Sequence, residues 1–263
     1  MSDADSGKDS DKDYVRTEVG DGIAWVTLNE PRRLNPVTLA RIARIQDVVA
    51  GLSPRPDVRV IVVTGAGRGF CSGADLKDET LRTAPMFPPA SGTLLDSRDG
   101  LWNLSAVRQP VIAMVNGPAF GYGYELALQA DIRIAGESAR FGFPYAKMGA
   151  VTDTGAATWL LPRQVGYALA AELLFTGRVL TGAQAREVGL VSQVVPDESL
   201  RAVTTELARE IAAGDPAAVQ ASKRMLVAGR DQSAAEHVLM QFQYANRYRP
   251  DLGEAAARLT GGR

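Results

Sequence analysis

The chain has 263 residues, 46% hydrophobic and 22% charged, so it is long enough to bury a large core and ordinary in composition for a globular protein. Its formal net charge of −1 excludes a bulk field that would recruit nucleic acid or anionic lipid. One cysteine, Cys71, excludes an intramolecular disulfide framework, and no apolar run approaches the ~20 residues of a membrane span. We therefore expect a cytoplasmic protein with neither nucleic-acid nor membrane partners.

The N-terminal part predicts a tail, a hairpin and a helix. Residues 1–13 are rich in Asp, Ser and Lys and lack an apolar segment, which predicts a disordered tail in place of a signal peptide. Segments 14–19 and 23–28 predict two strands, because the Gly-Asp-Gly sequence at 20–22 is typical of a hairpin turn. Residues 38–52 predict a helix, since their apolar side chains recur at helical spacing.

The middle of the chain predicts buried strands separated by helical segments. Three runs are almost entirely apolar, as strands buried on both faces should be: 58–63, 111–115 and 132–135. Residues 121–129, between the last two runs, predict a helix. This alternation predicts an α/β fold built from crossover units.

Beyond about residue 156 the strand signals thin out, apart from 191–195. Three segments show helical spacing instead: 200–213, 216–227 and 234–246. We predict an α/β core over residues 14–195 and a helical C-terminal region over residues 196–263. That region is either a small domain or a surface that packs on a neighbouring subunit.

The first of two glycine-rich turns spans residues 65–77 and follows a predicted buried strand. Four glycines in nine residues let the backbone bend sharply and approach a ligand. Phe70 occupies the third glycine position of a dinucleotide fingerprint, and no Gly-Lys-Ser/Thr follows, so a nicotinamide dehydrogenase and a phosphate P-loop are both disfavoured. A purely structural loop stays open as an alternative.

The second turn, residues 116–126, leads from a predicted strand into a predicted helix. The first amides of a helix lack intrahelical acceptors and lie at the positive end of its dipole, which suits a developing oxyanion. Glu125 comes three residues after Tyr122, so its carboxyl group can lie near those amides. The alternative is that Glu125 only complements the helix dipole.

Further segments accompany these two turns in a fixed order between residues 24 and 254. They are Pro31 with Asn35, then 70–76, 116–126, 130–135, 141–142, 160–163, 175–177, 185–191 and 222–223. Taken together, they make the chain resemble the enoyl-CoA hydratase/isomerase (crotonase) superfamily. The resemblance implies a crotonase-like α/β fold of repeated β-β-α units wound into a spiral, with a helical C-terminal region. It also implies an acyl-CoA thioester substrate and a homotrimer, or a hexamer that is a dimer of trimers.

The resemblance also implies an oxyanion hole made by the backbone amides of Ala74 and Tyr122, which would stabilise a thioester enolate. Most family members carry a small residue where Tyr122 stands, but only the amide is needed there. The implied substrate contacts are Arg33, Ser72, Gly73, Asp75, Leu76, Lys77, Gly121 and Tyr145. Arg33 and Lys77 are either partners of the coenzyme A phosphates or simply exposed charges. Coenzyme A is part of the substrate, so no separate cofactor is expected, and one histidine with one cysteine predicts no metal site.

Catalysis in this family depends on carboxylates. In hydratases that resemble this chain two glutamates hold a water molecule; Glu125 matches the first, but Tyr145 stands at the position of the second. A phenol, with an ordinary pKa of about 10, is a poor replacement for a carboxylate base. Asp153 matches the catalytic aspartate of acyl-CoA isomerases, among them ring-epoxide isomerases of phenylacetyl-CoA breakdown and dienoyl-CoA isomerases.

Three functions stay open. Isomerisation of a double bond is slightly favoured, because it needs one carboxylate to carry a proton. Hydration by a Glu125/Asp153 pair is the alternative, and Asp153 could also be only a helix N-cap. A non-catalytic acyl-CoA-binding protein is the second alternative, which Tyr122 and Tyr145 favour.

Overall fold

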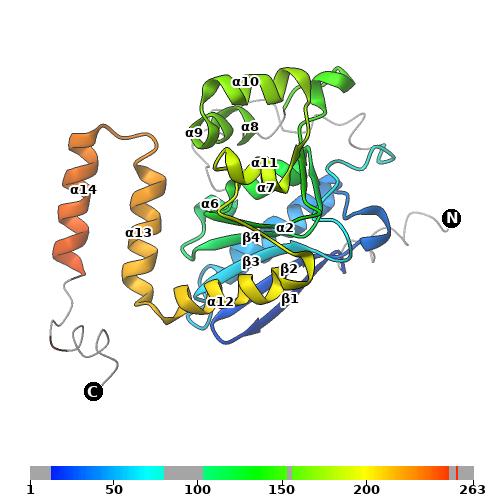
Figure 1. Ribbon diagram of the computed structural model, residues 1–263. Coiled ribbons are helices and arrows are strands. Elements are labelled where there is room, and N and C mark those ends of the chain that lie inside the picture. The colour runs from blue at the N-terminus through cyan, green and yellow to red at the C-terminus, as the bar shows by residue number, and fades with distance from the viewer. Residues whose placement is uncertain (1–12, 80–102, 153–155, 249–252, 254–263) are drawn as a thin grey trace. The chain divides into compact units, whose positions relative to one another are not determined.

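The computed structural model describes residues 13–79, 103–152, 156–248 and 253. These residues group into two units, the first ending at Ala213 and the second beginning at Gly214 (Figure 1). The division falls after the helix 200–213, so the predicted start of the C-terminal region at residue 196 lies inside the first unit. None of the helices in the described part of the chain combines the length and apolarity of a transmembrane span.

A six-stranded sheet forms the centre of the first unit. Its strands, in spatial order, are β1 (Val15–Gly20), β2 (Ile23–Leu28), β3 (Val60–Gly65), β4 (Val111–Val115), β6 (Ile132–Gly136) and β9 (Gln193–Val195). β1 and β2 form the predicted antiparallel hairpin, and Asp21 and Gly22 at its turn both have positive φ, as a two-residue type I′ turn requires. All other neighbouring strands are parallel, as the crossover pattern predicted.

Helices cover both faces of this sheet. Alternate residues of β3 divide between two apolar clusters: Ile61 and Val63 pack with residues of α2 (Leu39–Leu52) and α7 (Tyr122–Gln129). Val60 and Val62 pack with residues of α12 (Leu200–Ala213). Figure 1 shows α7 and α12 on opposite sides of the sheet. Because successive side chains of a strand point to opposite faces, an unbroken apolar run is the expected sequence of such a doubly covered strand.

A second, three-stranded sheet was not predicted from the sequence. It contains β5 (Pro118–Phe120), β7 (Arg140–Gly142) and β8 (Leu180–Thr181), in that order. β5 lies between β4 and α7, so the predicted direct step from strand to helix is corrected to strand, short strand, helix. Strands of two or three residues are too short to show a period of their own, which is why the pattern did not reveal them.

Short helices complete the first unit. They are η1 (Pro31–Arg33), α6 (Asn103–Ala106), η2 (Tyr145–Met148), α8 (Ala156–Trp159), α9 (Leu161–Val165), α10 (Tyr167–Thr176), α11 (Gly182–Glu187) and η3 (Asp197–Ser199). The second unit is a helical pair, α13 (Pro216–Ala228) and α14 (Ala234–Arg247), which confirms the helices predicted there. Asp215 and Ser233 cap their N-termini by accepting hydrogen bonds from backbone amides.

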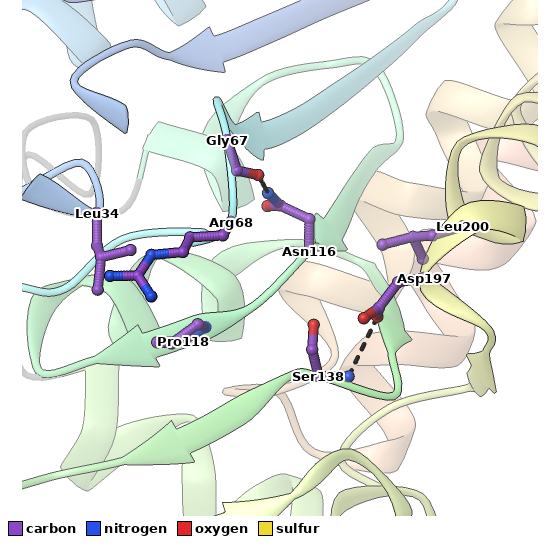
Figure 2. Close-up of a pocket in the computed structure, with 8 residues that line it drawn as sticks. All are labelled: Leu34, Gly67, Arg68, Asn116, Pro118, Ser138, Asp197 and Leu200. Atoms are coloured by element: carbon purple, nitrogen blue, oxygen red, sulfur yellow. Dashed lines mark hydrogen bonds between the residues drawn. The ribbon is translucent and has the colours of Figure 1, made fainter. Parts of the chain in front are cut away.

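Two asparagines hold the first glycine turn in place. The buried Asn35 amide nitrogen donates to the carbonyl oxygens of Ala66, Gly69 and Phe70 at 3.0, 2.8 and 3.2 Å. Asn116 donates to Gly67 O at 2.9 Å, a hydrogen bond drawn in Figure 2. The turn therefore has a fixed shape even though no strand or helix continues beyond Gly65 into it.

Replacing Asn35 by Ala is expected to lower the free energy of unfolding by about 3 kcal/mol, because the Ala66 and Phe70 carbonyl oxygens lose this donor and the Glu30 amide loses its acceptor. Urea denaturation measures the change. Asn29→Ala is the matched control, since Asn29 donates only one exposed hydrogen bond, and it should stay within about 0.5 kcal/mol of wild type. Equal effects of the two substitutions would show that the Asn35 network is not needed.

The cavity drawn in Figure 2 lies beside this turn and has a volume of about 570 Å³. Asn116 and Arg68 border it, and Asp197 accepts a hydrogen bond from the Ser138 amide at 3.1 Å. None of the predicted site residues that the structure describes lines it.

Candidate active site

Three predicted site residues follow three neighbouring parallel segments of the chain. Cys71 forms a parallel bridge with Ala119 of β5, and β5 pairs in parallel with β7. Ala74 comes three residues after Cys71, and Tyr122 three residues after Ala119. Tyr145 follows the end of β7 in the same way. The carboxyl ends of parallel strands meet at one edge, so the fold brings these three residues together.

The two glycine turns touch each other through their backbones. A Cβ atom at Gly73 would lie 2.7 Å from the Phe120 carbonyl oxygen, and one at Gly121 would lie 4.0 Å from Gly73 Cα. Gly73 also has a φ of +91° and Gly121 a φ of +50°, in the left-handed region that favours glycine. Gly73 is therefore required for both conformation and space, and Gly121 for conformation alone, since a Cβ atom there would have no contact shorter than 3.4 Å.

The amide of Ala74 points away from the strand beside it. Val37 N donates to Gly73 O at 2.9 Å, and Asp75 N donates to Val37 O at 2.8 Å. Because both partners flank Ala74 in a parallel ladder, its own N–H faces the opposite side. Tyr122 begins α7, where the first amides of a helix have no intrahelical acceptor. Both predicted oxyanion donors thus belong to residues that border one pocket.

This pocket has a volume of about 730 Å³ and is largely apolar. It brings together eight of the predicted site residues: Ser72, Gly73, Ala74, Asp75, Leu76, Gly121, Tyr122 and Tyr145. Among the described residues, the rest of its lining was not predicted from the sequence: Asp78, Phe120, Pro144, Met148, Ala150 and Val151. Only their position in the sequence could have indicated that they line the pocket, because each lies within a few residues of a predicted site residue.

Three predicted residues lie outside the lining of this pocket, and a fourth is not among the described residues. Glu125 is fully buried in α7 and is not among the lining residues of the pocket. Arg33 and Lys77 are exposed outside it. Asp153 lies outside the described residues, although Ala150 and Val151, which precede it, line the pocket.

An ion pair stands at the edge of the pocket. The Arg33 guanidinium donates two hydrogen bonds of 2.6 Å to the Asp75 carboxylate. This pairing holds the pKa of Asp75 below its usual range, and the Lys77 amide adds a further hydrogen bond at 3.0 Å. A phosphate bound by Arg33 would have to share the guanidinium with Asp75. Of the two predicted phosphate partners, Lys77 would therefore bind a phosphate without sharing its charge with Asp75.

Replacing Asp75 by Asn is expected to lower the midpoint of urea denaturation at pH 7, and this difference should disappear in acid. Because the pKa of Asp75 is lower in the folded state, its ion pair stabilises the protein above about pH 4 and is lost as the pH falls through the folded pKa. Denaturation at pH 7 and at successively lower pH values, down through the pKa of Asp75 in the folded state, measures both effects. Asp57→Asn is the control, since its pair with Arg55 is exposed and should contribute little.

Aromatic side chains build the wall beside Tyr145. The buried Tyr124 ring stacks on Phe143 with 4.1 Å between centroids, and Phe143 lies 6.3 Å from the Tyr145 ring at an interplanar angle of 20°.

Burial raises the pKa of the Cys71 thiol to about 12, so this cysteine stays protonated at neutral pH and is not a nucleophile.

Comparison with known proteins identifies the family. The profile of the enoyl-CoA hydratase/isomerase family matches residues 18–248. The chain belongs to the enoyl-CoA hydratase/isomerase family. This confirms the resemblance noted in the sequence, and the crotonase fold with a helical C-terminal region is confirmed with it. The protein is an enzyme of this family.

Its relatives carry out more than one reaction. The chain is 36% identical to the (E)-benzylidenesuccinyl-CoA hydratase of Thauera aromatica, covering 86% of each protein. It is 37% identical to the 1,2-epoxyphenylacetyl-CoA isomerase of Escherichia coli, covering 76% of each. The crystal structure of an enoyl-CoA hydratase from Bacillus anthracis superposes with a TM-score of 0.82 at 30% identity, covering 93% of this chain and 95% of that one. Membership of the family therefore leaves hydration and isomerisation both available.

Proposed function

We propose that this enzyme moves a proton next to the carbonyl of an acyl-CoA thioester and isomerises a double bond through an enolate. The observation that carries the proposal is the crossing of the two glycine turns, which sets Ala74 and Tyr122 at one edge of an apolar pocket. Their amides would donate to the thioester oxygen. As negative charge develops on that oxygen, preorganised donors stabilise it and thereby acidify the neighbouring C–H bond.

Glu125 and Asp153 are the proposed proton carriers. One carboxylate takes the proton from the carbon beside the thioester and returns it to a carbon farther along the acyl chain of the substrate. The double bond moves, and the carboxylate is regenerated. Glu125 is buried in α7, three residues after Tyr122 along the helix. Asp153 is assigned from the resemblance alone.

Hydration is the alternative, with Glu125 and Asp153 together orienting a water molecule. Tyr145 stands where hydratases of this family carry a second glutamate, which is why isomerisation is favoured. The non-catalytic acyl-CoA-binding alternative is not retained, since the chain belongs to a family whose members are named for the reactions they catalyse.

An acyl group bearing an aromatic ring fits this pocket. Phe120, Tyr122 and Tyr145 line it, and flat rings pack favourably against such a wall. Two relatives are named for substrates that carry a phenyl ring, benzylidenesuccinyl-CoA and epoxyphenylacetyl-CoA. We include aryl thioesters among the proposed substrates for these two reasons.

Coenzyme A would run along residues 72–76, with Lys77 and Arg33 near its phosphates and no separate cofactor.

We further propose a cytoplasmic homotrimer or a dimer of trimers. Exposed apolar side chains on the second unit support a subunit contact: Leu226, Val238, Leu239, Phe242 and Tyr248.

The deciding experiment incubates the enzyme with 2-enoyl- and 3-enoyl-CoA thioesters, alkyl and aryl, in deuterated water. Mass spectrometry and NMR follow the products of wild type and of Asp153→Asn. Migration of the double bond in wild type is the expected result, and its loss in Asp153→Asn would identify Asp153 as the carboxylate that carries the proton. Formation of 3-hydroxyacyl-CoA would show that the enzyme is a hydratase and would contradict the proposed isomerisation. Tight binding without any deuterium exchange would contradict the proposed enolate chemistry.

A further inference from the structure

We propose that Tyr145 is a catalytic residue whose hydroxyl group donates a third hydrogen bond to the thioester oxygen, beside the two backbone amides. This inference rests on the proposed enolate chemistry and deepens it. It gives a role to the residue by which this chain departs most clearly from hydratases of its family.

The position of the hydroxyl group is the first argument. A Cβ atom at Gly121 would lie 3.4 Å from Tyr145 Oη and 3.6 Å from its Cζ, so the phenol sits directly against Gly121. The peptide bond that leaves Gly121 carries the Tyr122 amide, which is one of the two proposed oxyanion donors. Tyr145, Gly121 and Tyr122 all line the same pocket. A thioester oxygen bound by the Tyr122 amide would therefore lie close to the phenol as well.

The second argument is that the fold holds Tyr145 there without a substrate. Gly121 N donates to Gly142 O at 3.0 Å, which ties the start of the Tyr145 segment to the second turn. The ring then continues the stack of Tyr124 and Phe143. On its C-terminal side, Ala150 N donates to Tyr145 O at 2.9 Å and closes the η2 turn. A donor fixed in advance stabilises developing charge more than one that must reorient during the reaction.

The third argument is chemical. A protonated phenol donates a hydrogen bond, whereas a second carboxylate at this position would repel the enolate unless it held a water molecule or a proton. No bond to Tyr145 forms or breaks in the proposed role: its proton stays on Oη while the hydrogen bond strengthens as charge gathers on the thioester oxygen. The step therefore needs no further proton donor or acceptor.

Tyr145→Phe removes the hydroxyl group and keeps the ring. The rate of deuterium exchange next to the thioester carbonyl should fall on the order of 100-fold, with KM changed far less, as loss of one oxyanion donor does elsewhere. The infrared stretching band of a 13C-labelled thioester carbonyl, measured on bound cinnamoyl-CoA, should shift from its wild-type position towards that of the free ligand. A residue that only shapes the pocket would change KM and leave this band in place.

Tyr167→Phe is the matched control, because Tyr167 lies on α10 with 79% of its surface exposed and outside the pocket. It should match wild type in both measurements. Exchange at the wild-type rate in Tyr145→Phe, with an unchanged carbonyl band, would overturn the role of Tyr145 and leave the proposed enolate chemistry standing. Binding of thioesters by wild type with neither exchange nor a shifted band would overturn both proposals.

Discussion

Replacing Glu125 by Gln should lower kcat for double-bond migration by about 100- to 10,000-fold, the usual contribution of a positioned acid or base. The substitution keeps the size and shape of the side chain and removes only its ability to carry a proton. Glu125 is fully buried in α7, so an isosteric change is the one least able to disturb the fold. Steady-state kinetics and deuterium exchange measure the loss, and thermal denaturation checks that the variant is folded.

The control for this experiment is Glu187→Gln, because Glu187 is exposed at the end of α11 and should leave kcat unchanged. Wild-type turnover in Glu125→Gln would show that Glu125 serves only the dipole of α7. In that case Asp153 would be the principal base, and loss of migration only in Asp153→Asn would identify it. Loss of hydration in both variants would instead indicate a water molecule held by two carboxylates.

Replacing Gly73 by Ala should lower the exchange rate by at least about 100-fold, because it disturbs the oxyanion hole directly. The added Cβ would lie 2.7 Å from the Phe120 carbonyl oxygen, which is backbone and cannot rotate away. The two glycine turns must then separate, and the Ala74 amide moves with the first of them. The left-handed φ of +91° adds a conformational cost of about 1–3 kcal/mol.

Gly189→Ala separates the effect of backbone strain from the effect of the contact between the two turns. Gly189 has a φ of +74°, but a Cβ atom there meets nothing within 4 Å. This control should lose stability through backbone strain and keep the wild-type exchange rate. If Gly73→Ala retains the wild-type rate as well, contact between the turns is not what positions the oxyanion donors. Urea denaturation alongside deuterium exchange distinguishes the outcomes.

The parallel strands and most long helices could be predicted from local pattern, and the reason is physical. β3, β4 and β6 are covered on both faces, so nearly every side chain must be apolar, and such runs stand out in the sequence. Helix α12 buries one stripe against the sheet, which produces the spacing seen at residues 200–213. Each signal comes from neighbours along the chain.

The sequence by itself determined which elements form, which turns are rich in glycine and which family the motifs resemble. Only the tertiary structure decided that Ala74, Tyr122 and Tyr145 meet, because their meeting depends on pairing between Cys71, β5 and β7. The ion pair between Arg33 and Asp75 and the burial of Glu125 were likewise visible only in the tertiary structure. Strands of two or three residues and pairs of distant side chains leave no periodic trace, since their stabilisation comes from partners far away in the chain.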